Sequence, residues 1–279
     1  GSAQKWFQIS DGTRLAIWQY PGARRPEILL VHGLASNARL WDAVVMHLNA
    51  SGYGTMQIDL RGHGISDKPD SGYDFATLSF DLASVISEMM RPPVIAVGQS
   101  FGGNLVMELA TRSSALVSSI VCVDGGFIDL SERFGTWEAC LAALTPPPLD
   151  HLSAASLDEA AAELYAGWSA AAIAAQLANL EEAEDGSMRR RLPLEHHLSI
   201  LRAMFEQDPL AVAESCQQPV LLIAADDDTP RKKDQVSAFV KRLANGRAVW
   251  KQGHHDLHAE QPGSVVEVME RALTEGFLR

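Results

Sequence analysis

The sequence of 279 residues predicts an α/β fold in which a mostly parallel central sheet is flanked by helices. Short continuous apolar runs alternate with segments of helical periodicity, and turn residues separate them. Such alternation requires right-handed crossover connections, which place helices on both faces of the sheet. The alternation breaks once, over residues 127–213, where helical stretches rich in Ala and Leu follow one another. We therefore expect a core domain formed by residues 1–126 and 214–279 and a helical cap, residues 127–213, inserted after the sixth core strand.

The first part of the predicted core contains strands and helices in regular succession. Apolar runs bounded by Gly, Pro or Asp are typical of buried strands, whereas apolar residues spaced three and four apart are typical of helices. The helix over 75–90 ends before Pro92 and Pro93, because proline lacks the backbone N–H and clashes with the preceding turn. Strands are expected at 5–9, 14–20, 28–31, 53–60, 94–97 and 116–123, and helices at 40–48, 75–90 and 104–112.

The insertion interrupts this succession, and the α/β pattern then resumes. Its Ala-rich stretches have high helix propensity, and spaced Leu, Tyr and Trp residues mark their packing faces. No convincing strand is visible in the insertion, and we interpret its acidic run 181–185 and basic run 189–191 as a solvated loop. Helices are expected at 157–168, 170–180 and 194–205 in the insertion and at 233–243 and 262–278 after it, with strands at 219–225 and 247–250.

Composition and charge exclude several classes of protein. The net charge of −12 repels polyanions, and no basic stripe offsets it, so neither nucleic acid nor an anionic membrane is an expected partner. Cys122, Cys140 and Cys216 are odd in number and lack metal-like spacing, which argues against a disulfide framework. No continuous apolar run is long enough to span a membrane, and no signal-peptide pattern opens the chain. We expect a cytoplasmic protein that acts on a small molecule.

The strand at 94–97 leads into Gly98-Gln-Ser100-Phe-Gly102, and helical periodicity follows. A serine at such a turn lies in a strained backbone conformation, and its glycine neighbours are required where the strand and the helix pass closely. Unpaired N–H groups at the start of the helix favour negative charge beside the hydroxyl. The pattern alone also occurs in glycine-rich turns with an idle serine. Its position between a strand and a helix favours a nucleophile at Ser100.

A serine nucleophile needs a general base and a carboxylate that orients the base. In open parallel sheets, ligands gather at the carboxyl ends of the strands, so both groups should follow strand ends. Asp226–Asp228 follow the strand at 219–225, and a segment with His254, His255 and His258 follows the strand at 247–250. The chain thus provides the order Ser, Asp, His, and a histidine-based metal site lacks the ligand spacing that would support it.

Four ordered motifs now stand along the chain. They are His32-Gly-Leu34, Asp59-Leu-Arg-Gly-His-Gly64, Gly98-Gln-Ser-Phe-Gly-Gly103 and His255-Asp-Leu-His-Ala-Glu-Gln-Pro262. Over nearly its whole length the chain resembles the α/β-hydrolase family, specifically its capped serine hydrolases. The resemblance implies Ser100 as nucleophile, His255 as general base and then acid, and no cofactor or metal. It also implies an oxyanion hole formed by the backbone N–H groups of Leu34 and Phe101.

The resemblance selects the histidine more sharply than the acid. In the family the catalytic histidine is followed five residues later by Glu, as His255 is by Glu260. In the family, the strand before the acid usually ends in Gly-x-x-Asp. Here Ala225 stands in place of the glycine, and the residue three positions later is Asp228. Asp227 remains an alternative, as does Asp124, because some relatives carry the acid at the end of the preceding strand.

The implied reaction is acyl transfer to water, with a carboxylesterase or lactonase as the first expectation. A serine at position 100 disfavours haloalkane dehalogenase and epoxide hydrolase, whose family members use aspartate at this position. C–C bond hydrolase, thioesterase, cofactor-free perhydrolase, acyltransferase or lyase, and a non-catalytic small-molecule receptor remain alternatives. The apolar insertion suggests a small to medium, largely apolar substrate. Trp137, Tyr165 and Trp168 are candidates for the pocket roof, although aromatic residues at helical spacing also serve packing alone.

Overall fold

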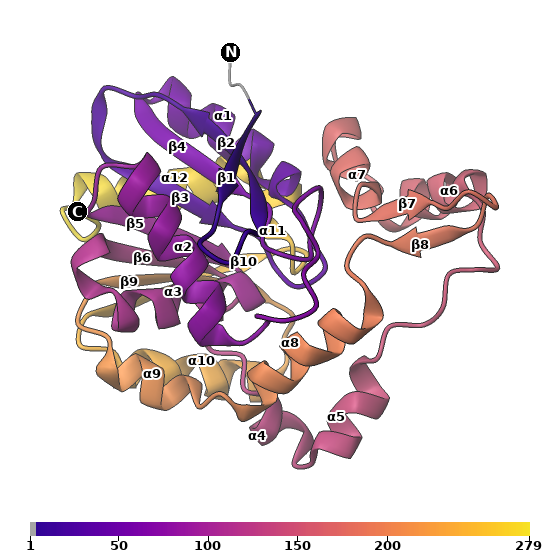
Figure 1. Ribbon diagram of the computed structural model, residues 1–279. Helices are drawn as coiled ribbons and strands as arrows, with labels where there is room; N and C mark the ends of the chain where they lie inside the picture. The colour runs from indigo at the N-terminus through magenta and orange to yellow at the C-terminus, as the bar shows by residue number, and fades with distance from the viewer. Residues whose placement is uncertain (1–3) are drawn as a thin grey trace.

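The computed structural model describes residues 4–279 and contains an eight-stranded sheet of order β1-β2-β4-β3-β5-β6-β9-β10 (Figure 1). Strand β2 pairs antiparallel with β1 and β4, and the remaining neighbours are parallel. The predicted α/β fold with a mostly parallel sheet is therefore confirmed. The strands are β1 (Gln4–Gln8), β2 (Arg14–Tyr20), β3 (Arg24–Val31), β4 (Tyr53–Ile58), β5 (Val94–Gln99), β6 (Val117–Val123), β9 (Val220–Asp226) and β10 (Gly246–Gln252).

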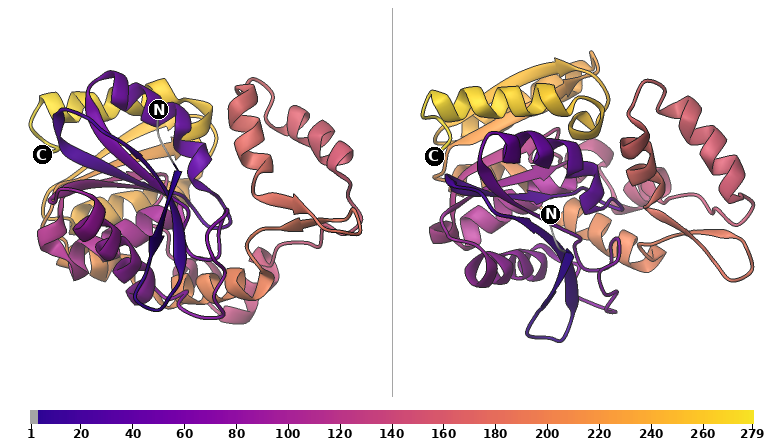
Figure 2. Two further views of the ribbon diagram at one scale, coloured as in Figure 1. Left: turned by 45° about the horizontal axis from the view of Figure 1, so that its top comes forward. Right: turned by 90° about the horizontal axis from the view of Figure 1, so that it is seen from above.

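Helices cover both faces of this sheet (Figures 1 and 2). Alternate strand residues point to opposite faces, so Ile28 and Leu30 of β3 lie in one core cluster while Leu29 and Val31 lie in the other. Helices α1 and α12 complete the first cluster, and α2, α3 and α10 complete the second. These helices are α1 (Asp42–Ala50), α2 (Phe75–Met89), α3 (Phe101–Arg112), α10 (Pro230–Arg242) and α12 (Pro262–Thr274), with short η1 (Ala38–Trp41), η2 (Ser114–Leu116) and α11 (Leu257–Glu260).

The segment between β6 and β9 leaves the sheet, and Figure 2 shows it on one side of the α/β layers. Its helix α8 joins it to the core, because Ile200, Leu201 and Met204 belong to the same apolar cluster as α2 and α3. The elements are α4 (Leu130–Phe134), α5 (Trp137–Leu144), α6 (Ala154–Leu164), α7 (Ala170–Leu177), β7 (Leu180–Glu182), β8 (Met188–Arg190), α8 (Leu194–Glu206) and α9 (Pro209–Ser215).

Two details of this segment differ from expectation. The runs interpreted as a solvated loop form the antiparallel pair β7–β8, so the prediction of no strand there is wrong. Glu181 lies opposite Arg189 with an ion pair of 3.0 Å, and the turn between the strands contains Gly186 at φ 81°. Helix α9 packs against α3 and α10, so residues 209–213 lie with the core layers. Within residues 4–279, no helix combines the length and apolar character needed to span a membrane.

A buried ion pair fixes the long connection between β4 and α2. The Arg61 side chain is 2% exposed and donates to both carboxylate oxygens of Asp81, at 2.7 and 2.8 Å, with Asp81 1% exposed. Arg61 also donates to Asp11 and to the backbone oxygen of Ser71. Fork-to-fork geometry and additional acceptors offset the cost of removing these charges from water.

Replacing Asp81 with Ala is expected to lower the free energy of unfolding by about 3–5 kcal/mol, because the Arg61 guanidinium would stay buried without its partner. Urea unfolding followed by circular dichroism measures the change. The matched control is Glu206→Ala, which removes an exposed pair with Arg202 on α8 and should cost below about 0.5 kcal/mol. Equal losses of unfolding free energy in the two variants would contradict the larger contribution assigned to the buried Arg61–Asp81 pair.

Candidate active site

Ser100 occupies a strained turn between β5 and α3. Its backbone has φ 55° and ψ −126°, and its N–H donates to Val123 O at 3.0 Å. A Cβ on Gly98 would lie 2.1 Å from Gly102 O, and one on Gly102 would lie 2.4 Å from His32 O. Only glycine therefore permits the strand, the helix and the loop after β3 to approach so closely. The turn places the Ser100 side chain in the wall of a cavity.

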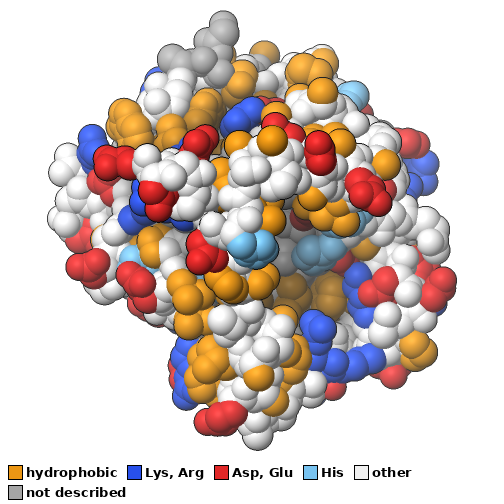
Figure 3. All heavy atoms as spheres, turned by 90° about the vertical axis from the view of Figure 1, so that its right-hand side faces the viewer, with side chains coloured by type: hydrophobic (Ala, Val, Ile, Leu, Met, Phe, Trp, Pro, Cys, Tyr) orange, Lys and Arg blue, Asp and Glu red, His pale blue; other side chains and the backbone are white. Residues whose placement is uncertain are grey.

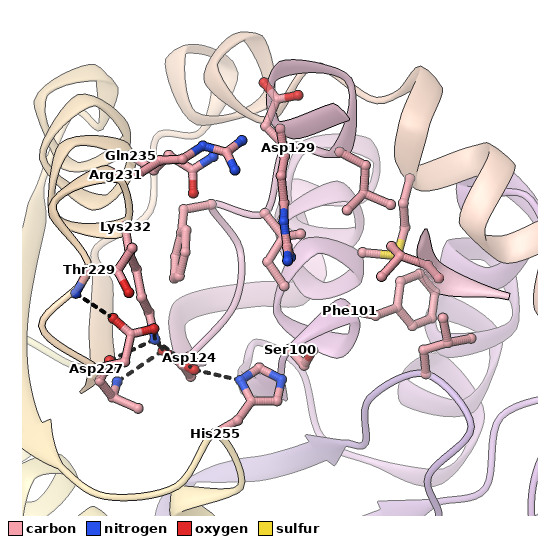
Figure 4. Close-up of a pocket in the computed structure, with 18 of the residues that line it drawn as sticks. Ser100, Phe101, Asp124, Asp129, Asp227, Thr229, Arg231, Lys232, Gln235 and His255 are labelled. Atoms are coloured by element: carbon pink, nitrogen blue, oxygen red, sulfur yellow. Dashed lines mark hydrogen bonds and ion pairs between the residues drawn. The ribbon is translucent and has the colours of Figure 1, made fainter. Parts of the chain in front are cut away.

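His255 lies in the loop after β10, and its Nδ1 donates to Asp124 Oδ2 at 2.5 Å. Asp124 directly follows β6, is 2% exposed, and also accepts from the backbone N–H of Ala225 at 2.9 Å. Figure 4 shows the His255 ring between Asp124 and Ser100, with its second nitrogen on the side of the serine. No hydrogen bond joins the Ser100 and His255 side chains in this structure. Such contacts often tighten only when substrate binds.

The structure corrects the predicted acid. The Asp228 side chain is 84% exposed and lies 3.5 Å from Lys233, away from His255. Strand β9 stays paired with β10 through Asp226, so Asp227 and Asp228 fall in the turn that leads into α10. Asp227 accepts there from the backbone N–H of Thr229. The carboxylate that meets His255 is Asp124, which the sequence offered only as an alternative.

Lys232, which the sequence analysis did not single out, contacts the same carboxylate. Its Nζ lies 2.8 Å from Asp124 Oδ1 and donates to the backbone oxygen of Ala225 at 2.6 Å, and the side chain is 16% exposed. Helix α10 begins after the short turn that follows β9, and the sheet order places β9 next to β6, so the lysine in the first turn of the helix reaches the carboxylate that follows β6. Lys232 lies in the first turn of the helix that follows Asp226–Asp228, and this position next to a strand end is the sequence signal that could have pointed to Lys232.

These contacts set the protonation of the pair. Burial raises the pKa of Asp124, but hydrogen bonds from His255 and Lys232 and their charges outweigh it, so the net pKa is lowered. Burial lowers the pKa of His255, but the hydrogen bond to Asp124 and its negative charge outweigh that effect and raise the net pKa. The charge of Lys232 opposes protonation of His255. Asp124 is thus a carboxylate that holds the imidazole in one tautomer.

Leu34 and Phe101, whose backbone N–H groups are the expected oxyanion donors, line the same cavity as Ser100. Neither donates to an acceptor within residues 4–279. Phe101 is the first residue of α3, where N–H groups have no intrahelical partner. His32 fixes the Leu34 turn, because its Nδ1 donates to Gly33 O at 2.7 Å while its Nε2 accepts from the backbone N–H of Leu60 at 3.0 Å. Burial lowers the pKa of His32 to about 4, so the ring is neutral, as this bonding requires.

The loop that carries His255 is held from two sides. Gln99, next to Ser100, donates to Asp256 Oδ1 at 3.0 Å and to the backbone oxygen of His255 at 3.2 Å. Gln176 of α7 donates to Asp256 Oδ2 at 2.6 Å. The inserted segment therefore contacts the residue that follows the histidine, which the sequence did not indicate.

The three aromatic candidates for the pocket roof do not line the cavity, so that prediction is corrected. Trp137 packs edge-on against Phe205, at a ring distance of 5.8 Å, and under the guanidinium of Arg202. The rings of Tyr165 and Trp168 pack against each other in a tilted arrangement, with centroids 4.6 Å apart, beside the His254 ring. Trp137 begins α5, whereas Tyr165 and Trp168 follow the end of α6, and all three pack against other rings, the alternative given with the prediction.

The cavity itself has a volume of about 710 Å³. Figure 3 shows that this side of the molecule is hollowed, with histidine, apolar and basic side chains around the hollow. Helices α4 and α8 form much of the wall, because Leu130 and Arg133 of α4 and His197, Leu201 and Met204 of α8 line it. In the part of the chain that the structure describes, no group of three or more His, Cys, Asp or Glu side chains is placed to hold a metal ion.

Known proteins share sequence and fold with this chain. A model of the Alpha/beta hydrolase family matches residues 28–268. The 2-(acetamidomethylene)succinate hydrolase of Mesorhizobium japonicum is 34% identical over 99 residues, 36% of this chain and 35% of that protein. The chain thus spans about a third of the length of that curated relative.

Solved structures share the fold over nearly the whole chain. The crystal structure of E-2-(acetamidomethylene)succinate hydrolase matches with a TM-score of 0.78 at 21% identity, covering 98% of this chain and 100% of that chain. The enol-lactonase from Burkholderia xenovorans matches with a TM-score of 0.71 at 19% identity, covering 97% and 100%. At such low identity these likenesses show the fold alone.

Replacing Asp124 with Asn is expected to lower the pKa of His255, because the negative charge that raises it is removed. Lys232→Met should raise the same pKa, since it removes the opposing cation. Titration of the His255 ring by heteronuclear NMR measures both shifts. Asp228→Asn is the matched control and should leave the pKa in place; a drop in that variant instead of in Asp124→Asn would refute the corrected pairing.

Proposed function

The chain belongs to the alpha/beta hydrolase family, and from this premise we propose that it is a serine hydrolase that forms an acyl-enzyme on Ser100. The observation that carries the proposal is the His255 ring, which is hydrogen-bonded to buried Asp124 on one side and faces Ser100 on the other (Figure 4). The proposed substrate is a small to medium ester or a compound with a related acyl bond.

The first half of the reaction forms the acyl-enzyme. Ser100 Oγ attacks the substrate carbonyl carbon while His255 Nε2 accepts the hydroxyl proton, and Asp124 stabilises the resulting imidazolium. The negative oxygen of the tetrahedral intermediate accepts hydrogen bonds from the N–H groups of Leu34 and Phe101. Loss of one such donor typically costs about 3 kcal/mol of transition-state stabilisation. Collapse of the intermediate breaks the bond to the leaving group, which takes the proton from His255.

The second half releases the acid. A water molecule loses a proton to His255 and attacks the acyl carbon, and the second tetrahedral intermediate expels Ser100 Oγ, which recovers the proton. The histidine must therefore be neutral at the start of each half. Asp124 must stay ionised throughout, and the lowered pKa that Lys232 helps to maintain supports this requirement.

An ester or lactone bond is the first choice for the scissile bond, in keeping with the enol-lactonase whose fold the chain shares. C–C bond hydrolysis, thioester hydrolysis, perhydrolysis and acyl transfer use the same nucleophile and base, and a receptor would retain the triad without turnover. Product analysis separates them. Ester hydrolysis in ¹⁸O-labelled water releases an acid with one labelled oxygen and an unlabelled alcohol, whereas thioester hydrolysis releases a thiol, C–C hydrolysis a product with a new C–H bond, and perhydrolysis a peracid.

Ser100→Ala is expected to reduce kcat for short 4-nitrophenyl esters by about 10⁴-fold or more, and Asp124→Asn by roughly 10³- to 10⁴-fold, because each removes one member of a cooperating unit. Initial rates of 4-nitrophenol release measure the effect. Asp228→Asn should retain the wild-type rate, since that carboxylate is exposed and remote from His255. Full turnover by Ser100→Ala would exclude the proposed nucleophile.

The pH profile provides an independent test. Because His255 acts as a base and its pKa is raised above the ordinary 6.5, kcat/KM should increase with pH through a midpoint above 6.5. Removing the cation in Lys232→Met raises the pKa further, so the midpoint should move to higher pH. Rates measured from pH 5 to 9 in both proteins determine the midpoints. An unchanged or lower midpoint in Lys232→Met is the contrary result.

A further inference from the structure

The charged side chains that line the cavity are not equivalent. Lys232 is paired with Asp124, and Arg231 pairs with Glu132 at 2.9 Å. Figure 4 shows Arg231 beside Gln235, away from Ser100. These two cations therefore already have protein partners and have limited capacity to bind a ligand.

The carboxylates in the lining are also engaged. Asp129 accepts from the Ser131 hydroxyl at 3.0 Å and from the backbone N–H of Glu132 at 2.9 Å, as the cap of α4. Asp227 accepts from the backbone N–H of Thr229 and lies 3.9 Å from Lys232. Neither carboxylate makes an ion pair with the remaining arginine of the cavity.

That remaining arginine is Arg133. Its guanidinium forms no ion pair and no hydrogen bond with any residue of 4–279. Arg133 is exposed, and its guanidinium lies over the Phe134 ring at 4.9 Å. Asp129, one helical turn earlier, would be the natural partner, but its carboxylate is turned to the start of α4. An unpaired guanidinium in the cavity wall of a protein with net charge −12 is available to an anionic ligand.

His197 of α8 is a second side chain of the same cavity whose ring has no hydrogen-bond partner among the described residues. The residue is 9% exposed. Its Nδ1 is fully buried, whereas its Nε2 is not. A ligand in the cavity can therefore reach Nε2, the ring nitrogen that has accessible surface and no protein partner. Burial lowers the pKa of His197 to about 4, and a neutral imidazole keeps one donor and one acceptor.

We propose that the cavity selects acyl substrates that carry a carboxylate remote from the scissile bond, with Arg133 pairing with that carboxylate and His197 hydrogen-bonding to the bound ligand. The proposal rests on the serine hydrolase function and adds the substrate class. It modifies the expectation of a largely apolar substrate, which now applies to the segment between the two polar ends. Phe127, Leu130, Leu201 and Met204 provide apolar wall for that segment. Guanidinium and carboxylate match as planar forks, which makes the pair directional as well as electrostatic.

The test compares pairs of substrates that differ only in the remote group. Mono-4-nitrophenyl esters of glutaric, adipic and suberic acids carry a free carboxylate, and their methyl-blocked counterparts do not. For the chain length that is hydrolysed fastest, the wild-type protein should favour the free acid by about 10- to 100-fold in kcat/KM, the usual strength of a hydrogen bond to a charged group. Arg133→Met should bring this ratio close to one.

His197→Phe keeps the ring volume and removes both nitrogens, so it should reduce the ratio by about 3- to 10-fold. The matched control is Arg202→Met, which removes an arginine of α8 that lies outside the cavity and should leave the ratio unchanged. Unfolding midpoints identify any variant that is simply destabilised. A wild-type ratio near one at every chain length would overturn the proposal, as would a ratio that survives Arg133→Met but is lost in Arg231→Met.

Binding separates this proposal from the proposed function. Calorimetric titration of the unreactive Ser100→Ala protein with adipate and with dimethyl adipate reports the subsite without turnover. Adipate should bind at least about tenfold more tightly than its dimethyl ester, and the added Arg133→Met change should remove the difference. If the wild-type protein hydrolyses no ester but adipate binds in this way, the subsite stands and the reaction type is wrong. Equal binding of the two compounds means that the subsite is absent.

Discussion

The hydrogen bond between His255 and Asp124 is the contact on which the rest of the site depends, because it joins the ends of two strands that are not neighbours. Strand β9 lies between β6 and β10 in the sheet. Asp124 bridges this strand: its Oδ1 accepts from the backbone N–H of Ala225 in β9, while its Oδ2 accepts from His255. The carboxylate is thereby fixed to the sheet on one side and free to orient the imidazole on the other.

Most of the fold could be predicted because it follows from local periodicity. Buried parallel strands are continuous apolar runs and the helices are amphipathic, so element type and order are evident without knowledge of tertiary contacts. The β7–β8 hairpin was missed because its strands are three residues each and polar, and its stability depends on cross-strand pairs such as Glu181 with Arg189. Runs of charged residues are typical of solvated loops. These two runs form strands because their residues pair with each other across the turn, which the sequence pattern does not show.

The candidate site could be predicted where one motif contains the information and not where two segments must be combined. The turn at Ser100 and the spacing from His255 to Glu260 are local patterns. The acid depends on where β9 ends relative to β6, and Asp228 leaves the sheet in a turn of φ 58° before α10 begins. Arg133 and His197 lie on separate helices of the insertion and have no sequence motif. Their importance emerges only from which side chains do and do not have partners.

The insertion contributes to both binding and catalytic geometry through different contacts. Helices α4 and α8 form cavity wall, and α8 is held to the core by buried apolar residues. Helix α7 is attached by a small apolar cluster of Ala175 with Leu40 and Ala259. Polar contacts add to it, in which Gln176 donates to Asp256 and Asn37 donates to the backbone oxygen of Ala175. Asp256 also accepts from Gln99, so the loop that carries His255 is held both by the residue before Ser100 and by the insertion. A change in the insertion can therefore alter the position of the base as well as the shape of the cavity, so substrate selection and catalytic geometry are not independent in this chain.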